Sequence, residues 1–534
     1  MRESLAAALE RGAEGPPDDI AWLHQVETSL PGRSADLPFS HLFAGLAHGA
    51  FDDCVERWPP ECRAAFAESA RVGAIAWLLN RLGLVSVRLL MSRLEPGSAG
   101  ERTNYAHLCR SLARERLEPL RSQFPAWAAL VDLVLDSWAQ ALTEFVERIC
   151  ADEAVLAITF GSAVPARIER IRLASTQSRK GGRQSLFVGL AGGTEPVEVL
   201  YKPRDLTIEK AFVQLARTVL ADNETLQSAR VLPIAETHGY VNVLRKRECA
   251  IDELPDFYRQ CGRLLALMYS VSVDDGHMGN VLACGVDPVP IDVESWLSGT
   301  GPMGRRSDRP TVMQVGMVPS WRKAPASGAP MDSTALGVQT SVENSGRIPG
   351  IVDINTDGMR AGSTDAAWQD IPSLPRPSTE PNPLARYADE LIGGFEEGYD
   401  RVLSQRVQIA RNIAACRGLS ARAVGRPMRL YSMIAFDSLS AEWLESVADR
   451  ETYLLARLAT SPVVGEGFQP TIADEAAALM RCDVPYWTAK VGEATSDYDH
   501  LAAVLARLDA MSSNDRAEQV HLIRRAIASR WPAT

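Results

Sequence analysis

No two cysteines in this sequence have the Cys-x-x-Cys spacing of a zinc site, because the nine cysteines are scattered along 534 residues. Reduced thiols, as in cytosolic proteins, are the simplest interpretation. Basic residues are not in excess either. The 56 Lys and Arg face 67 Asp and Glu, and the resulting net charge of −11 argues against a general nucleic-acid binder. That charge is still compatible with a locally basic site for a peptide or a nucleotide.

Membrane and export signals are also missing. No apolar run reaches the ~20 residues that span a bilayer. The first residues, MRESLAAALERGAEG, form a charged amphipathic pattern rather than a secretory signal. We therefore expect a cytoplasmic protein without a membrane span. Its length and its hydrophobic content of 46% predict a globular chain of roughly two to four domains.

The order of patterns along the chain predicts an α+β fold in three parts. Residues 1–155 repeat apolar residues at helical spacing and predict a helical domain. Residues 156–250 hold two pairs of short apolar runs, which predict a small antiparallel β lobe. Residues 251–534 predict a helical catalytic lobe. Within it, residues 297–385 are dense in Gly, Pro and Ser, which predicts a long mobile insertion at the position of an activation loop. This order is that of a bilobal kinase preceded by a helical domain.

The most informative segment is 269-YSVSVDDGHMGNVLACGVDPVPIDVESW-296, which has the spacing of an ATP-dependent phosphotransferase. Asp275 and Asn280 lie five residues apart in a polar loop, and Asp292 follows after a short predicted hairpin. In protein kinases a loop Asp accepts the hydroxyl proton of the substrate, and an Asn shortly after it holds magnesium. A metal-binding Asp follows further along the chain. Polar turns that merely flank a hairpin would explain either segment alone, but they explain the joint spacing poorly.

Residues of the β lobe add candidates for nucleotide binding. Lys202 ends a predicted strand and is placed to reach the phosphates of ATP, although a surface lysine that extends toward water would give the same pattern. Arg204 is a candidate for supporting a phosphate or an acidic residue. The N–H groups of Gly181 and Gly182 are candidates for approaching a phosphate closely, but plain turns use Gly-Gly as often.

The loop itself supplies the remaining candidates. His277 would donate to a phosphate, orient Asp275, or simply pack. Asn280 and Asp292 are the predicted magnesium ligands. Glu294 is a third candidate ligand, because alternate residues of a strand point to one face.

These segments occur together with others along nearly the whole chain. They are Phe124-Pro125, Val199-Leu-Tyr-Lys-Pro-Arg204, Asp275-Gly-His-Met-Gly-Asn280, Ile291-Asp-Val-Glu-Ser295, Val315-Gly-Met-Val-Pro-Ser-Trp321, Gly394-Phe395 with Tyr399, and Arg422 with Arg426-Pro427 and Tyr431. In these segments the chain resembles the dehydratase part of class II (LanM-type) lanthipeptide synthetases.

The resemblance implies a lipid-kinase-like core with a helical activation domain. It also implies an enzyme that phosphorylates Ser or Thr of a ribosomally made precursor peptide with ATP and Mg²⁺. Elimination of the phosphate would then give dehydroalanine or dehydrobutyrine. By that likeness the residues for phosphorylation are Lys202, Asp275, His277, Asn280, Asp292 and Glu294, and Arg422 clamps the departing phosphate.

Three departures from the family bear on function. Full synthetases carry a cyclase with zinc ligands, but Cys482 is the only cysteine after Cys416, so we expect a separate cyclase to close thioether rings. Met428 stands six residues after Arg422 where the family has Thr, and a thioether cannot donate a proton. Thr176-Gln-Ser-Arg179 stands where the family has Gly-Asp-Ser-His.

We therefore expect a peptide Ser/Thr phosphotransferase in which phosphate elimination is weakened. A complete dehydratase that works with a separate cyclase is one alternative. A catalytically quiet scaffold that binds the precursor peptide is another. A small-molecule kinase of the antibiotic-phosphotransferase kind shares the loop spacing, but it does not predict the N-terminal helices.

Overall fold

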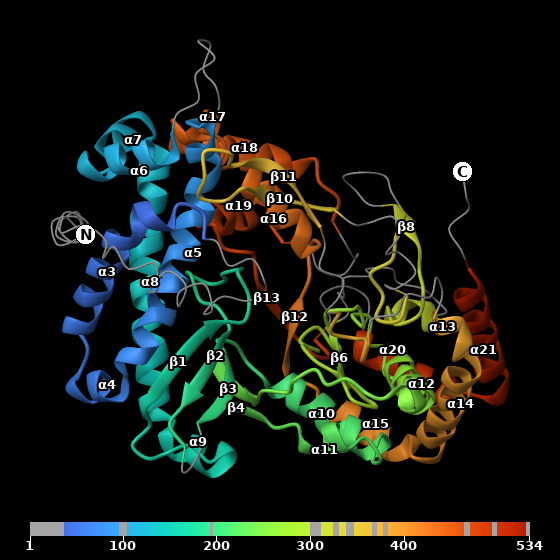
Figure 1. Cartoon of the computed structure of the whole chain (residues 1–534). Coiled ribbons are helices and arrows are strands. Elements are labelled where there is room, and N and C mark those ends of the chain that lie inside the picture. Colours follow the sequence, from blue (N-terminus) through green and yellow to red (C-terminus); the bar gives the residue numbers. More distant parts are fainter. Residues whose placement is uncertain are drawn as a thin grey trace.

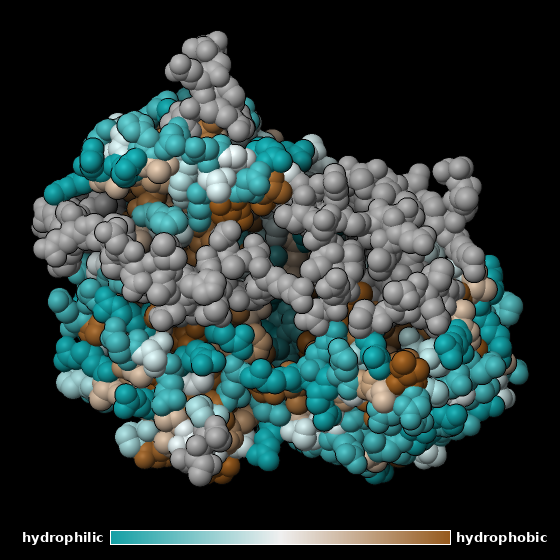
Figure 2. Space-filling view, viewed as in Figure 1, coloured by the Kyte–Doolittle hydropathy of each residue, from teal (hydrophilic) through white to brown (hydrophobic). Residues whose placement is uncertain are grey.

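The described residues form a mixed α/β structure with a small antiparallel sheet (Figure 1). The computed structural model describes residues 37–94, 104–192, 196–298, 311–323, 330–337, 347–365, 371–376, 383–463, 470–493 and 499–529. In the view of Figure 1, the N-terminal helices and the sheet lie on the left and a helical half lies on the right. Figure 2 shows a hydrophilic recess between these two halves.

The described residues of the N-terminal part are mainly helical, and residues 1–36 and 95–103 of the predicted helical domain lie outside the described ranges. Its helices are α3 (Ser40–Glu56), α4 (Pro60–Ala65), α5 (Glu68–Ser92), α6 (Tyr105–Arg114), α7 (Glu118–Gln123), α8 (Pro125–Ala151) and α9 (Glu153–Phe160). By length and composition alone, α5 is apolar enough to cross a membrane. However, 83% of its most apolar window is buried inside the protein, where it packs against α3, α8 and the first strand of the sheet.

The sheet contains both hairpins predicted from the sequence and one further strand. The strands are β1 (Ile168–Leu173), β2 (Leu186–Leu190), β3 (Val197–Lys202), β4 (Val231–Ala235) and β5 (His238–Asn242), in the order β1-β2-β3-β5-β4. All neighbours are antiparallel. Alternate residues of β2 face the helices, so Leu186, Val188 and Leu190 join the same hydrophobic core as α5 and α8. The helical part and the sheet therefore share one core. The β2–β3 turn includes residues 193–195, which lie outside the described residues.

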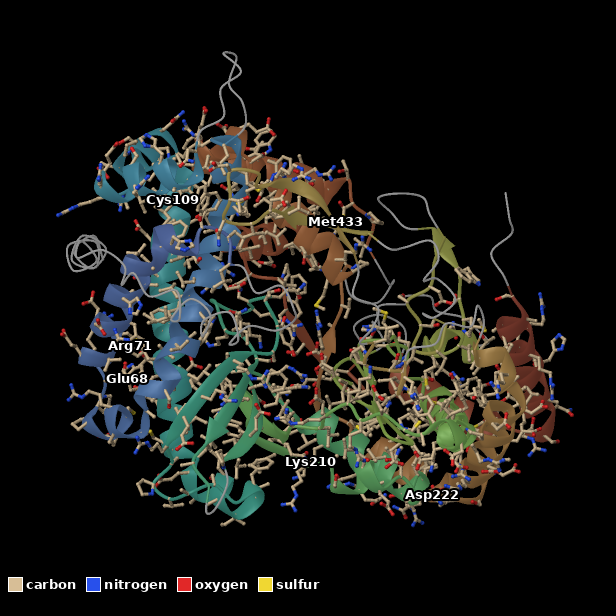
Figure 3. The ribbon with its side chains drawn as sticks, viewed as in Figure 1. Glu68, Arg71, Cys109, Lys210, Asp222 and Met433 are labelled. Carbon is tan, nitrogen blue, oxygen red and sulfur yellow. The ribbon has the colours of Figure 1, made fainter. Side chains whose placement is uncertain are left out.

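A second core belongs to the right-hand half. It is built on α10 (Thr207–Val219), α11 (Glu224–Ser228), α12 (Leu254–Ser270), the hairpin β6 (Val281–Cys284) and β7 (Asp287–Pro290), α14 (Ala388–Ser404), α15 (Arg406–Ala414), α20 (His500–Ala510) and α21 (Ser513–Ala528). A short 3-10 helix, η1 (Ile251–Glu253), leads into α12. Helices α12 and α14 pack closely because Gly394 has no side chain, and a Cβ there would lie 1.9 Å from the carbonyl oxygen of Arg259. Asp222 (Figure 3) follows α10 and binds Arg401 of α14 at 2.6 Å, which ties the two helices together.

A third, smaller hydrophobic core is formed by C-terminal helices that pack against the N-terminal half. It contains α16 (Met428–Asp437), α18 (Val447–Ala459) and α19 (Ile472–Met480), with α17 (Ala441–Leu444) between the first two. Arg88 of α5 binds Asp437 at 2.9 Å, and Leu444 is buried in the first core. The pair β12 (Ser420–Ala423) and β13 (Trp487–Lys490) connects this part to the right-hand half.

The described parts of the predicted insertion, residues 297–385, are structured. They include η2 (Val312–Val315), β8 (Arg322–Lys323), β9 (Pro330–Met331), β10 (Arg347–Val352), β11 (Arg360–Asp365) and α13 (Pro383–Arg386). At the tip of the β10–β11 hairpin, Asn355 accepts hydrogen bonds from Phe39 N and Tyr105 OH, each at 2.8 Å. This tip of the insertion is therefore attached to the N-terminal helices. The other residues of the insertion lie outside the described ranges.

Candidate active site

Lys202 and Asp292, which are 90 residues apart in sequence, meet in the structure. Lys202 ends β3, where Pro203 prevents further strand pairing. Asp292 follows β7 and has a left-handed backbone with φ of 59°. The Lys202 Nζ lies 2.9 Å from the Asp292 Oδ1. Burial acts to raise the pKa of Asp292, but attraction from Lys202 and Arg204 outweighs it and holds this pKa well below its ordinary value. The aspartate is therefore ionised at neutral pH.

The lysine is positioned by a second carboxylate that the sequence did not single out. Glu209, in the first turn of α10, lies 3.3 Å from the Lys202 Nζ and also binds Arg204. Arg204 in turn donates to Asp292 at 2.6 Å. Lys202, Arg204 and Glu209 are almost fully buried, whereas the Asp292 side chain is 44% exposed. Asp292 is thus the member of this group that faces outward.

Glu294 lies at the centre of a cluster of arginines. Its carboxylate binds Arg204 Nε at 3.0 Å, Arg179 at 3.4 Å and Arg422 at closer range. The guanidinium groups of Arg179 and Arg422 lie over the ring of Tyr486, at 5.2 and 5.4 Å from its centroid. Burial opposes ionisation of Glu294, but the three arginines prevail and lower its pKa to about 2. Because this carboxylate already binds three cations, the expectation that Glu294 is a magnesium ligand is not supported.

The loop after α12 holds Asp275, His277 and Asn280 together. The Asn280 Nδ2 donates to the carbonyl oxygen of Asp275 at 3.0 Å. The His277 Nδ1 accepts from Gly279 N at 2.9 Å, so its neutral ring carries the proton on Nε2, 3.5 Å from the Asp275 Oδ1. Burial lowers the pKa of His277. Of the roles considered for His277, this geometry fits orientation of Asp275.

Described parts of the insertion support the loop from the other side. Gly276 N donates to the carbonyl oxygen of Val315 at 2.8 Å, and Met278 N donates to that of Ser333 at 3.0 Å. A Cβ at Gly276 would lie 2.6 Å from the Val315 oxygen, so only glycine allows this approach. The loop is thereby fixed between α12 and the backbone of Val315 and Ser333.

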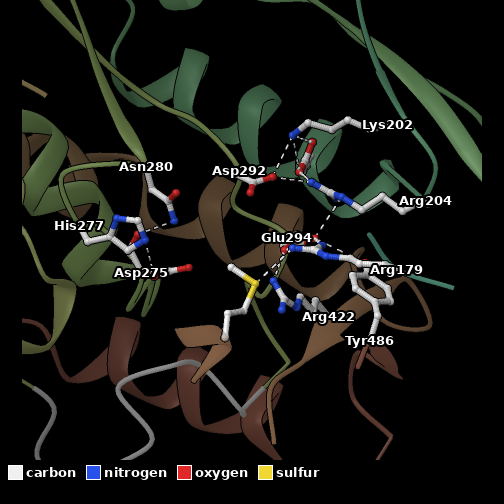
Figure 4. Close-up of polar contacts among 12 residues, drawn as sticks. Arg179, Lys202, Arg204, Asp275, His277, Asn280, Asp292, Glu294, Arg422 and Tyr486 are labelled. Atoms are coloured by element: carbon white, nitrogen blue, oxygen red, sulfur yellow. Dashed lines mark hydrogen bonds and ion pairs between the residues drawn. The ribbon is translucent and has the colours of Figure 1, made fainter. Parts of the chain in front are cut away.

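Two of the three predicted metal ligands fit a magnesium ion. Asn280 uses its amide nitrogen within the loop, so its side-chain oxygen is the atom that it could offer to a metal. Asp292 is the exposed carboxylate of the group, and Figure 4 shows it between the Asp275 loop and Lys202. Within the described ranges, no group of three or more His, Cys, Asp or Glu side chains could hold a metal ion. This donor set suits magnesium, which commonly binds one or two carboxylates together with substrate phosphates and water.

The predicted role of Gly181 and Gly182 is not supported. Both adopt positive φ, 83° and 84°. Their N–H groups donate to the buried carboxylate of Asp483, at 2.6 and 3.1 Å. They are therefore not available to a phosphate in this structure. No local pattern in the sequence signals Asp483, which is about 300 residues away.

Asp274 gives the protein a predicted pH dependence. Burial raises the pKa of its carboxyl from 3.8 to about 7. Between these values the folded state retains a proton that the unfolded state releases, so stability falls as pH rises. Asp274→Asn should therefore be more stable than the wild type above about pH 7, and no different below about pH 4. Urea denaturation across this range measures the difference, and a gap that is constant with pH would contradict the assignment.

Comparison with known proteins shows the family of the chain. A search of curated proteins finds no match. Residues 124–490, more than half of the chain, match a family described as "Domain of unknown function (DUF4135)". The matched range contains Lys202, the Asp275 loop, Asp292 and Arg422. The chain therefore belongs to the DUF4135 family.

Proposed function

We propose that the protein is an ATP- and magnesium-dependent kinase that phosphorylates Ser or Thr of a ribosomally made precursor peptide, as in LanM-type lanthipeptide synthetases. The DUF4135 family is associated with lanthipeptide synthetases. The observation that carries the proposal is the 2.9 Å contact between the strand lysine Lys202 and Asp292, beside the loop of Asp275 and Asn280. A bilobal kinase-like core would account for this arrangement.

The pairing of Lys202 with Glu209 further supports the proposal. In protein kinases, a strand lysine pairs with a glutamate of the following helix, and a metal-binding Asp completes the group. Here Glu209 lies on α10, which follows β3 directly. Pairing with Glu209 would hold the Lys202 ammonium group in place to neutralise charge on the phosphates of a nucleotide.

In this proposal each side chain has a separate task. ATP would supply the phosphoryl group, and Asn280 and Asp292 would hold the magnesium ion. Asp275 would accept the proton of the attacking hydroxyl, and His277 would orient its carboxylate. Lys202 would neutralise phosphate oxygens.

Intact mass spectrometry of the precursor peptide encoded beside the gene, after incubation with ATP and Mg²⁺, tests the proposal. We expect products heavier by phosphoryl groups, and a chelator should abolish them. Products that are only lighter by water would indicate a complete dehydratase. An unchanged peptide that still binds the protein would indicate a scaffold, and would overturn the proposal.

A further inference from the structure

The turn that leads from α12 into the Asp275 loop has a serine at a position that favours glycine. Helix α12 ends with the two backbone hydrogen bonds of a Schellman motif, from Ser272 N to Tyr269 O at 3.3 Å and from Val273 N to Met268 O at 2.9 Å. Ser272 has a left-handed backbone with φ of 58°. Glycine adopts this conformation without the strain that a Cβ adds. A serine at this position therefore points to a role for its hydroxyl group.

The hydroxyl group of Ser272 binds Arg507, which lies on α20. The Arg507 Nη1 donates a hydrogen bond to the Ser272 Oγ at 3.2 Å. The same guanidinium group lies over the ring of Tyr269, with its Cζ 3.9 Å from the ring centroid. The face of an aromatic ring attracts a cation at this distance. Arg507 therefore contacts both the last turn of α12 and the residue at which the chain turns into the loop.

The ring beneath Arg507 is itself held in place by α21. The Tyr269 hydroxyl donates to the carboxylate of Asp515 at 2.8 Å, and the hydroxyl of Tyr399 on α14 donates to the same carboxylate at 2.6 Å. Tyr269 and Tyr399 are both buried. Helix α20 packs against α12, and α21 packs against α14 (Figure 1). The support for Arg507 is therefore rigid.

Helix α21 also reaches the far side of the Asp275 loop. Gln519 lies one turn after Asp515, is 2% exposed, and donates to the Asp515 Oδ1 at 3.1 Å. Its Oε1 accepts a hydrogen bond from Val312 N at 2.9 Å. Val312 begins η2, and Val315 ends it and accepts from Gly276 N at 2.8 Å. Gln519 thus supports the segment that holds the loop at Gly276.

We propose, relying on the proposed function, that Arg507 and Gln519 are positioning residues that fix the segment 272–276 and so hold Asp275 in the geometry of phosphoryl transfer. Arg507 acts at the first residue of this segment, and Gln519 acts through η2 at the last. Both act through the loop and its supports rather than on the substrate. A displacement of about 1 Å in a reacting group lowers a rate by up to about 10²-fold.

Ser272→Gly separates positioning from a purely structural role. Glycine removes the hydroxyl group and relieves the left-handed strain, so the melting temperature should be equal to that of the wild type or higher. The kcat of phosphopeptide formation should nevertheless fall about tenfold or more, because the loop loses its contact with α20. The KM for ATP should change less than kcat, because Lys202 and Asp292 lie outside the segment. If Ser272 had only a structural role, kcat would not fall.

Variants of the two positioning residues should show the same division between kcat and KM. Arg507→Gln and Gln519→Leu should each lower kcat about tenfold or more. Arg507→Lys keeps the charge but loses the planar group that stacks on the ring, so its kcat should be intermediate. The matched control is Arg524→Gln on α21, because Arg524 is 59% exposed and lies 3.8 Å from Asp389 at the surface.

The double variant of Ser272→Gly with Arg507→Gln tests whether Arg507 acts through the serine hydroxyl. Residues that act through one shared contact are not additive. The double variant should therefore be no slower than Arg507→Gln alone. Losses of kcat that multiply would contradict a shared contact and overturn the role of Arg507.

Hydrogen exchange of residues 271–280 in the protein without nucleotide distinguishes failure of this inference from failure of the proposed function. Unchanged kcat in Ser272→Gly and Arg507→Gln, with an active wild type, would overturn the positioning role and leave the kinase activity intact. If the wild type transfers no phosphoryl group, the proposed function fails. Faster exchange in Arg507→Gln than in Arg524→Gln would then still support the anchoring of the loop, and equal exchange would overturn it. If Arg507→Gln does not fold, Ser272→Gly decides.

Discussion

Asp275→Asn should lower the rate of phosphoryl transfer to the peptide by about 10²–10⁴-fold, the usual contribution of a positioned general base. Asparagine keeps the size of the side chain, but it cannot accept the proton of the attacking hydroxyl. The carbonyl oxygen that anchors Asn280 belongs to the backbone of residue 275, so the loop should keep its geometry. The initial rate of phosphopeptide formation measures the effect.

A matched control variant and the KM for ATP show whether the effect is specific to proton transfer. Asp256→Asn changes an exposed aspartate in the first turn of α12 and should leave the rate unchanged. The KM for ATP should change little in Asp275→Asn, because the proposed nucleotide contacts come from Lys202, Asn280 and Asp292. A rate within a few-fold of the wild type would exclude Asp275 as the base. A large rise in the KM for ATP would instead assign Asp275 to nucleotide binding.

Local patterns in the sequence were sufficient to predict the elements that carry the central pair. The hairpin that ends at Lys202 combines alternating apolar residues with a Gly-rich turn, and β2 and β3 pair as expected. The polar loop with Asp275 and Asn280 follows a strongly periodic helix, α12. A second hairpin, β6–β7, then carries the chain to Asp292. Each of these sequence patterns lies within a few residues of the functional side chain that the corresponding element carries.

The long-range contacts around the site have no such local pattern in the sequence. Asp483 reaches Gly181 across 302 positions, and Arg179 reaches Met428 across 249. Tyr486 is brought to Arg422 by the pairing of β12 with β13, which joins two short strands on either side of a helical segment. Four-residue strands carry too little periodicity to be recognised. The cluster of arginines around Glu294 is thus a product of tertiary packing, whereas the residues of the predicted transfer site follow from local spacing.

Tertiary packing also explains Arg426 and Tyr431, which belong to the segments that resemble lanthipeptide synthetases. Arg426 and Tyr431 both bind the fully buried carboxylate of Glu475 on α19. The Arg426 Nε lies 2.8 Å from Glu475 Oε1, and the Tyr431 hydroxyl lies 2.5 Å from the same oxygen. These contacts hold α16 against α19, and α16 carries Met428. Arg426 and Tyr431 therefore have a structural role, which is to hold the start of α16 in place.

Glu475→Gln should lower the free energy of unfolding of this part by about 3–5 kcal/mol, because removing one partner of a buried ion pair leaves the other charge uncompensated. The side chains of Arg426 and Glu475 are 3% and 0% exposed, so water cannot readily replace the lost partner. Hydrogen exchange of α16, α18 and α19 measures the loss locally. Glu451→Gln, at an exposed position of α18, is the matched control and should change little.

The double variant Arg426→Leu with Glu475→Leu shows whether the loss of stability comes from an uncompensated buried charge or from lost packing. Replacing both charges with apolar residues removes the need to bury either ion, so the double variant should lose less stability than Glu475→Gln alone. A double variant at least as unstable as Glu475→Gln would show that the helices depend on the hydrogen bonds themselves. In that case the Tyr431 hydroxyl, which also loses its acceptor, would account for the additional loss.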